Sequence, residues 1–382
     1  MKKITSASII PGKPIPFSLY DKQGVLLLRQ GTVINMPHLI ERLVMRGAHY
    51  DEGEGESASS PVAGSQHKPV PVTSKLPAFE HINELTLNLK HVIGTALKNP
   101  EQIDVAPRIE KIALAIQQIC AEDIDSAIAA PCFDTFNPYI VVHQVMGAVL
   151  TELVAHGKEW PQKDRLSLVC AALTRDLGQV PIQTELDQHA GPVPEALRIR
   201  MQQHPNLSGD LLQRAGVTDG LWIEAVRGHH ERLNGSGYPA GIRAGQISLG
   251  PRILAVADTY SAMIKSRPYR NKPLFSQNAL KEIYQKKDAE IDGEIARILI
   301  SKIGLLSPGA IVKLKCGEIA VVKSPTVKAE GAVVYAIYST SGMPLSDPVR
   351  RETMDPRYQI TGLVPYSECR TASFIIKRVW TK

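Results

Sequence analysis

A break in composition constrains this chain more than any other feature. From Asp51 to Lys75 the sequence is acidic at first and then rich in Ser, Gly and Pro, with almost no bulky apolar residues. Such a stretch cannot bury enough apolar surface to offset the entropy lost on ordering it. Residues 51–76 are therefore predicted to be a flexible linker, and the chain of 382 residues to be multidomain.

The residues before the linker form a short unit of mixed pattern. Two apolar runs, at 16–20 and 25–28, flank a glycine and predict two strands around a turn. Residues 36–46 then carry apolar side chains at helical spacing. Residues 1–50 are predicted to be a small N-terminal α+β module, and our hypothesis for it is a regulatory or docking role.

Hydrophobic spacing is helical through residues 77–307, and no hairpin signal interrupts it. After Pro308 the hydrophobic period switches to two, which predicts strands at 311–322, 332–338 and 358–364. The fold class predicted is a central all-α domain over 77–307, flanked by the N-terminal module and by a small C-terminal β-barrel over 308–382. The helices expected after residue 135 lie at 140–154, 164–177, 195–213, 219–230, 251–265, 276–285 and 291–303.

Composition excludes several classes of protein. Hydrophobic residues make up 43% and charged residues 21% of the chain, as in globular proteins. The five cysteines are widely spaced without a Cys-x-x-Cys pair, which argues against a disulfide framework and a Cys-rich zinc site. No apolar run approaches the roughly 20 residues of a membrane span, and the first residues lack the apolar core of a signal peptide. A cytoplasmic protein without membrane association is the prediction.

The charge pattern bears on partners. The net charge is +6, with part of the surplus in the C-terminal fifth of the chain. That region lacks the dense basic and aromatic pattern of a nucleic-acid binder, so a nucleic-acid partner is not expected.

Six titratable residues of the helical domain stand on apolar stripes or at predicted helix ends. Burying a lone imidazole or carboxylate is costly unless it is paired or metal-bound. For each residue alone, a satisfied core histidine or a capping aspartate is the commoner explanation. The set fits a site for one or two first-row metals, with zinc, iron and manganese left open. Its members are His143, Asp176, His204, His229, His230 and Asp258.

The segment HHERLNGSGYPAG, residues 229–241, resembles the HHExxDGxGYPxG signature of the HD-GYP branch of the HD phosphohydrolase superfamily. Segments 251–258 and 266–270 and the pair His204-Pro205 are similar to that family as well, so the resemblance spans residues 135–300. It implies an all-α HD-type fold and a centre of two or three metals, usually iron or manganese. It also implies hydrolysis of the bacterial second messenger cyclic di-GMP to pGpG or GMP, through attack of a metal-bridging hydroxide.

The resemblance also implies a role for each residue. His143, Asp176 and Asp258 would hold one metal, and Asp176 would bridge at the reacting centre. The second metal would be held by Asp176 with His204, His229 and His230. The substrate-binding positions that it implies are Gly237, Tyr238, Pro239, Arg267 and Arg270, although a plain surface loop also accounts for the two arginines.

The chain departs from the family pattern where the family reads His-Asp-x-Gly-Lys. Here the residues are Arg175-Asp176-Leu177-Gly178-Gln179, and the loop aspartate is replaced by Asn234. A guanidinium has no lone pair for a metal, and its charge opposes a cation beside Asp176. The first metal site therefore loses a ligand, whereas the second keeps all four.

Two functions stay open at this point. A metal-dependent cyclic di-GMP phosphodiesterase, working with one metal or with two held weakly, agrees with the retained ligands. A catalytically inactive module agrees with the changes at Arg175 and Gln179; it would sense cyclic di-GMP or bind a signalling protein through the GYP loop or the terminal domains. A helical scaffold without a ligand leaves the buried polar set unexplained.

Overall fold

The computed structural model describes residues 76–98, 104–188, 193–265, 273–325 and 331–381, with part of the first 50 residues. The chain divides into two compact units, residues 1–73 and 74–382, and each is described by itself. Residues 51–75 of the predicted linker lie outside the described residues, as do Arg267 and Arg270.

The first unit contains a small antiparallel sheet of order β1-β4-β2-β3. The predicted strand pair is confirmed as β2 (Leu19–Tyr20) and β3 (Leu26–Leu28), which pair antiparallel. The strands β1 (Lys2–Lys3) and β4 (His49–Tyr50) were not predicted, because two residues are too few to show a period. Of the predicted helix 36–46, the described residues are helical.

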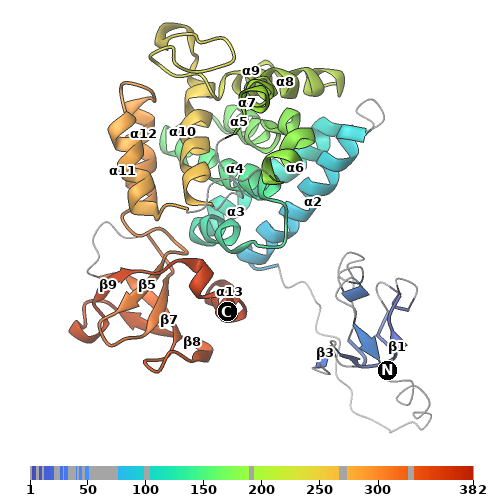
Figure 1. The fold of residues 1–382 in the computed structure, drawn as a ribbon, viewed down its shortest axis with the longest axis vertical. Helices are drawn as coiled ribbons and strands as arrows, with labels where there is room; N and C mark the ends of the chain where they lie inside the picture. The colour runs from blue at the N-terminus through green and yellow to red at the C-terminus, as the bar shows by residue number, and fades with distance from the viewer. Residues whose placement is uncertain are drawn as a thin grey trace. The chain divides into compact units, whose positions relative to one another are not determined.

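Helices make up most of the second unit, which confirms the all-α prediction for its larger part (Figure 1). Two boundaries differ from the prediction. The helix expected at 195–213 is two helices, because Pro205 favours the start of a helix and begins a new one after Gln203. The helix expected at 164–177 ends at Thr174, and a further helix follows it. The helices are α2 (Ala78–Lys98), α3 (Val105–Phe133), α4 (Tyr139–Gly157), α5 (Gln162–Thr174), α6 (Val180–Gln188), α7 (Glu195–Gln202), α8 (His204–Arg214), α9 (Gly220–Gly228), α10 (Leu249–Ile264), α11 (Ser276–Lys286) and α12 (Gly293–Ile303).

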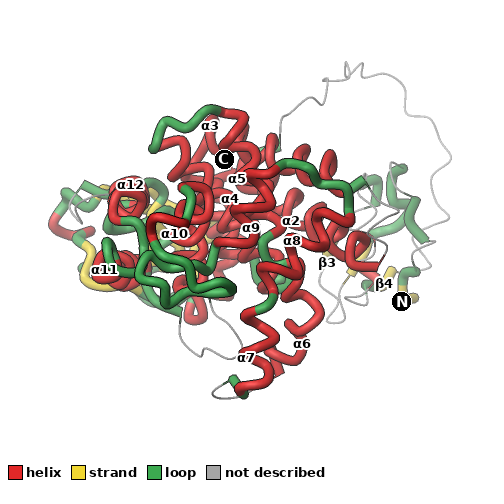
Figure 2. The backbone as a smooth tube through the Cα atoms, turned by 90° about the horizontal axis from the view of Figure 1, so that it is seen from above, coloured by secondary structure: helices red, strands yellow, loops and turns green. Residues whose placement is uncertain are grey.

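Helix α4 is the centre of the helical body and packs against α3, α5, α10 and α12. Seen from above, α6 and α7 project from this body (Figure 2). Among the described residues, α4 is the one helix long and apolar enough to cross a membrane, and 83% of its most apolar window is buried inside the fold. A helix that is apolar on all sides is expected at the core of such a bundle.

An antiparallel sheet of order β8-β7-β6-β5-β9 follows the helices. The predicted hairpin is confirmed, with Ile311 opposite Val321. The strand β8 was not predicted, because its sequence PLSDPVRRE is mostly exposed and carries two prolines. Within the described sheet β8 and β9 are the edges, so closure into a barrel stays a prediction. The strands are β5 (Ile311–Leu314), β6 (Ile319–Val322), β7 (Val333–Tyr338), β8 (Pro344–Glu352) and β9 (Ile360–Leu363).

The last described residues form helix α13 (Ser373–Thr381), which was not predicted. Helix α13 places the ring of Trp380 on the helical body. The ring stacks on Phe79 of α2, with centroids 5.5 Å apart, and lies 6.0 Å from the ring of Phe133. Sheet and helices share one hydrophobic core in one compact unit, and the predicted boundary between residues 307 and 308 stays a prediction.

Candidate metal centre

The structure brings all six predicted ligands together in two adjoining clusters. The first cluster is His143, Asp176 and Asp258, and the second cluster is His204, His229 and His230. Within each cluster the candidate ligand atoms lie within 4.8 Å of one another. They come from α4, the turn after α5, the start of α8, the residues after α9, and α10.

A close approach of two elements places Asp176 beside the second cluster. After α5 the chain makes a short 3-10 turn, Leu177–Gln179, and Gly178 lies in it. A Cβ atom at Gly178 would lie 2.7 Å from the carbonyl oxygen of His204, so only glycine lets the turn approach α8 this closely. The Gly178 amide donates to the Ser208 hydroxyl at 2.8 Å, which fixes the contact.

Two histidines of the second cluster are oriented by the backbone. The Nδ1 atoms of His204 and His229 lie 2.6 Å from the carbonyl oxygens of Met201 and Val226. A carbonyl only accepts, so each Nδ1 carries the proton and each Nε2 offers a lone pair. The two Nε2 atoms are 3.3 Å apart, and they lie 3.4 and 3.9 Å from Oδ1 of Asp176. Metal-binding histidines are usually oriented by such hydrogen bonds.

The loop that follows holds the third histidine. The ring of His230 stacks on Tyr238, with centroids 4.5 Å apart. Glu231, which the sequence analysis did not single out, is buried and accepts hydrogen bonds from the amides of Ala240 and Ile242 at 2.8 and 3.1 Å. A carboxylate that follows a His-His pair and precedes a glycine-rich loop was the available signal for this tie.

Close backbone packing brings Gly237 and Tyr238 to the second cluster. A Cβ atom at Gly237 would lie 2.5 Å from the carbonyl oxygen of His230, so the loop folds back directly on the histidines. Gly237 and Tyr238 therefore lie beside the second cluster, and Pro239 follows them in the wall of a cavity.

The first cluster contains a fourth group, the side chain of Arg175, which is fully buried. Its Nε donates to Oδ1 of Asp258 at 3.0 Å and lies 3.5 Å from Oδ2 of Asp176. His143 also faces Asp258, with Nε2 2.9 Å from the same Oδ1. Since a carboxylate accepts, this Nε2 carries a proton.

The electrostatics separate the carboxylates from the histidines. Burial would raise the pKa of Asp176 and Asp258, but the Arg175 guanidinium holds the pKa of both well below the usual range. Burial lowers the pKa of His143, and it lowers that of His229 to about 3. Ionised carboxylates and neutral imidazoles are the protonation states that bind metals.

The two clusters differ in how they fit a metal. In the second cluster the Nε2 lone pairs of His204 and His229 and Oδ1 of Asp176 lie within 3.9 Å of one another. The first cluster has a guanidinium beside both carboxylates and a proton on Nε2 of His143, so this Nε2 and Oδ1 of Asp258 are already engaged.

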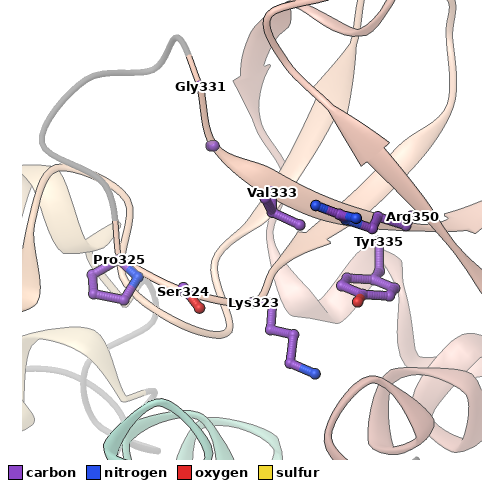
Figure 3. Close-up of a pocket in the computed structure, with 8 residues that line it drawn as sticks. Lys323, Ser324, Pro325, Gly331, Val333, Tyr335 and Arg350 are labelled. Atoms are coloured by element: carbon purple, nitrogen blue, oxygen red, sulfur yellow. The ribbon is translucent and has the colours of Figure 1, made fainter.

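Two cavities of the described residues are lined by none of the six. A cavity of about 800 Å³ lies against the loop after α9 and is lined by Arg227, Glu231 and Pro239, among others. Another, of about 400 Å³, lies on the C-terminal sheet, where Tyr335 and Arg350 line it (Figure 3).

Comparison with known proteins finds a family model, sequence relatives and a similar structure. The HD domain family matches residues 138–295. A cyclic di-GMP phosphodiesterase of Pseudomonas aeruginosa is 27% identical over 190 residues, covering 49% of this chain and 45% of the relative. The 3'3'-cGAMP-specific phosphodiesterase 3 of Vibrio cholerae is 28% identical, covering 48% and 42%. A cyclic di-GMP phosphodiesterase of Thermotoga maritima is 38% identical over 116 residues, covering 30% and 31%.

The chain spans less than half the length of these curated relatives. Among solved structures, Bd1817, described as a HDG"Y"P protein from Bdellovibrio bacteriovorus, matches with a TM-score of 0.52 and 17% identity. The match covers 78% of this chain and 98% of Bd1817, and it shows a shared fold.

The helical fold and its clustered histidines and aspartates define an HD-domain protein, a class whose members bind divalent metals. Within that class, the match over residues 138–295 and the named relatives support assignment of these residues to the HD-GYP family.

Proposed function

We propose that this protein is a metal-dependent phosphodiesterase of bacterial second-messenger signalling that hydrolyses cyclic di-GMP to pGpG or GMP in the cytoplasm. The observation that carries the proposal is the convergence of two oriented imidazoles on Oδ1 of Asp176, at 3.4 and 3.9 Å. Two of the relatives described above are named cyclic di-GMP phosphodiesterases, which supports the choice of substrate.

Asp176 and the three histidines of the second cluster would hold the metal, for which we propose iron or manganese. Bound there, a divalent metal would polarise a phosphoryl oxygen and lower the pKa of water, which is the chemistry that phosphodiester hydrolysis needs. We assign Asp176 as the catalytic carboxylate of the centre.

The remaining work belongs to the chain's own side chains. The Met201 and Val226 carbonyls keep the proton on Nδ1 of His204 and His229, so that both Nε2 atoms face the centre. The ring of Tyr238 stacks on one face of His230 and helps to hold it in place. We propose that Gly237, Tyr238 and Pro239 contact the nucleotide, and that Arg267 and Arg270 contact its phosphates.

The test measures hydrolysis of cyclic di-GMP, with 3'3'-cGAMP in parallel, by protein grown with iron and manganese and handled without oxygen. We expect turnover of cyclic di-GMP in the natural chain and its loss after joint replacement of His229 and His230 by Ala. The exposed His156 provides a matched control, because His156→Ala removes an imidazole away from both clusters. Turnover that survives the double replacement would contradict the proposal, and preference for 3'3'-cGAMP would correct its substrate.

A second candidate function is favoured by one observation, the buried guanidinium in the first cluster. In this alternative the domain binds cyclic di-GMP, or a signalling protein through the GYP loop or the terminal domains, and cleaves nothing. Saturable binding of cyclic di-GMP by metal-loaded protein that shows no turnover would support the alternative over the enzyme.

A further inference from the structure

We propose that the Arg175 guanidinium is the resident cation of the first cluster, so that the protein holds a single metal, in the second cluster. The inference rests on the metal-holding part of the proposed function and not on turnover. An inactive protein with one metal would therefore support it while the proposed function failed.

Each of the three nitrogens of the Arg175 guanidinium donates a hydrogen bond. Nε donates to Asp258, NH1 donates to the Ala172 carbonyl at 2.6 Å, and NH2 donates to the His143 carbonyl at 3.2 Å. The side chain has no exposed surface. A long cationic side chain held at three points inside the core is fixed in place, and its charge stays beside the two carboxylates.

The absence of a side chain at Gly147 leaves a space beside α4 that the guanidinium of Arg175 fills. Gly147 lies on α4, one turn after His143, and a Cβ atom there would lie 2.5 Å from NH1 of Arg175 and 2.9 Å from its Cζ. Glycine is otherwise unfavourable inside a helix. The guanidinium and Gly147 therefore fit as a pair.

The two carboxylate oxygens of Asp176 face different clusters. Oδ1 faces the Nε2 atoms of His204 and His229. Oδ2 makes no hydrogen bond and faces Arg175 at 3.5 Å and His143 at 4.0 Å. Oδ1 is thus available to a metal in the second cluster, whereas Oδ2 lies beside the guanidinium.

Charge balance follows from this division. The two carboxylates carry two negative charges, and the guanidinium neutralises one of them. A divalent ion in the second cluster then leaves a small positive surplus, whereas a second ion beside Arg175 would meet a fixed like charge.

The direct test counts metal in the full natural chain. After loading with manganese, we expect about one ion per chain and the six-line electron paramagnetic resonance signal of an isolated ion. Two ions per chain with an exchange-coupled signal would overturn the inference, and so would protein that retains no metal.

Paired variants locate the metal. Asp258→Asn removes a charge from the first cluster only, and we expect the variant to keep its one ion. His229→Ala should lose the ion. If Asp258→Asn loses metal as His229→Ala does, the first cluster binds it and the inference is wrong.

A double-mutant cycle tests the guanidinium without using metal, and it stays informative if Asp258→Asn does not fold. Gly147→Ala should lower the melting temperature of the natural chain and should be tolerated in an Arg175→Gln background. Gly94→Ala is the matched control, because a Cβ atom there meets nothing within 4 Å on α2. An equal effect of Gly147→Ala in both backgrounds would contradict the placement of Arg175.

Discussion

At the scale of single residues, Arg175 limits how many metal ions the centre can hold, so replacing it by the histidine of the family pattern should change metal content and activity. We expect Arg175→His with Gln179→Lys to raise the metal content from one toward two ions per chain. Cyclic di-GMP hydrolysis should rise on the order of a hundredfold, since polarising a phosphoryl oxygen is worth several kcal/mol. The histidine removes the opposing charge and adds a ligand, and the lysine restores a cation near the phosphate.

The single variants separate the two contributions. Arg175→His alone should give most of the metal gain, and Gln179→Lys alone little, because the Gln179 amide is engaged with Gln183 at 2.9 Å along α6. Metal analysis and turnover assays measure both. If the natural chain already turns over cyclic di-GMP at a rate that the double variant does not improve, Arg175 is an adapted part of a working centre.

The sequence predicted the residues of the candidate site better than it predicted their states. His143 and Asp258 were found because each breaks an apolar stripe, and His204, His229 and His230 because they stand at helix ends. The fit of Arg175 to Gly147 could not be predicted, since it depends on the distance between α4 and the turn after α5. The hydrogen bonds between Glu231 and the loop were missed because a single carboxylate after two histidines shows no hydrophobic periodicity, and periodicity is the sequence signal that indicates burial.

At the scale of elements, periodicity predicted the long helices and failed where another signal decided the structure. Helix α13 was missed because it lies in a region where a period of two dominates. The strand β8 was missed because its pairing with β7, and not its composition, makes it extended. Long runs with one buried face are legible in sequence, whereas edges and terminal pieces are set by their neighbours.

One element contact leads to a prediction about stability. The ammonium of Lys265, just after α10, donates to the carbonyls of Pro131 and Asp134 at 2.8 and 2.7 Å, at the C-terminal end of α3. A cation is favourable at that end of a helix, and the carbonyls lose their partner without it. We expect Lys265→Met to reduce the free energy of unfolding by about 2 kcal/mol.

Chemical denaturation measures this effect. Lys302→Met is the matched control, because Lys302 is exposed on α12, and it should change the free energy of unfolding by less than about 0.5 kcal/mol. Equal effects of the two replacements would show that the ammonium of Lys265 does not stabilise the end of α3.

At the scale of the whole molecule, the contact of α13 with α2 predicts that sheet and helices unfold together. Trp380 is buried between Phe79 and Phe133, so Trp380→Ala should lower the free energy of unfolding by about 3 to 5 kcal/mol. Thermal unfolding followed by circular dichroism should keep a single helical transition at a lower temperature. Phe374→Ala, at a ring that is 65% exposed, should leave the transition in place. A helical transition unmoved by Trp380→Ala would mean that the C-terminal segment unfolds independently.

The division of the chain into two units leads to a prediction about proteolysis. The sequence predicts a linker at residues 51–76, and residues 51–75 have almost no bulky side chains. Exposed segments of this composition are cut before packed helices. A brief digest with a protease of broad specificity should therefore release a fragment that begins near residue 76 and resists further cutting. Mass spectrometry identifies the ends, and early cuts within residues 140–260 would show that the helical body is not the compact part.

The stacked rings of Phe79 and Trp380 also decide how the second unit would carry tension. Helix α2 begins at Ala78 and α13 ends at Thr381, so this contact joins the first and last helices of the second unit. A force that pulls the two ends apart would be borne first by these rings and by the short helix behind them. The helices that hold the two clusters lie between α2 and α13 in the sequence. They would bear no load until the contact between Phe79 and Trp380 had broken.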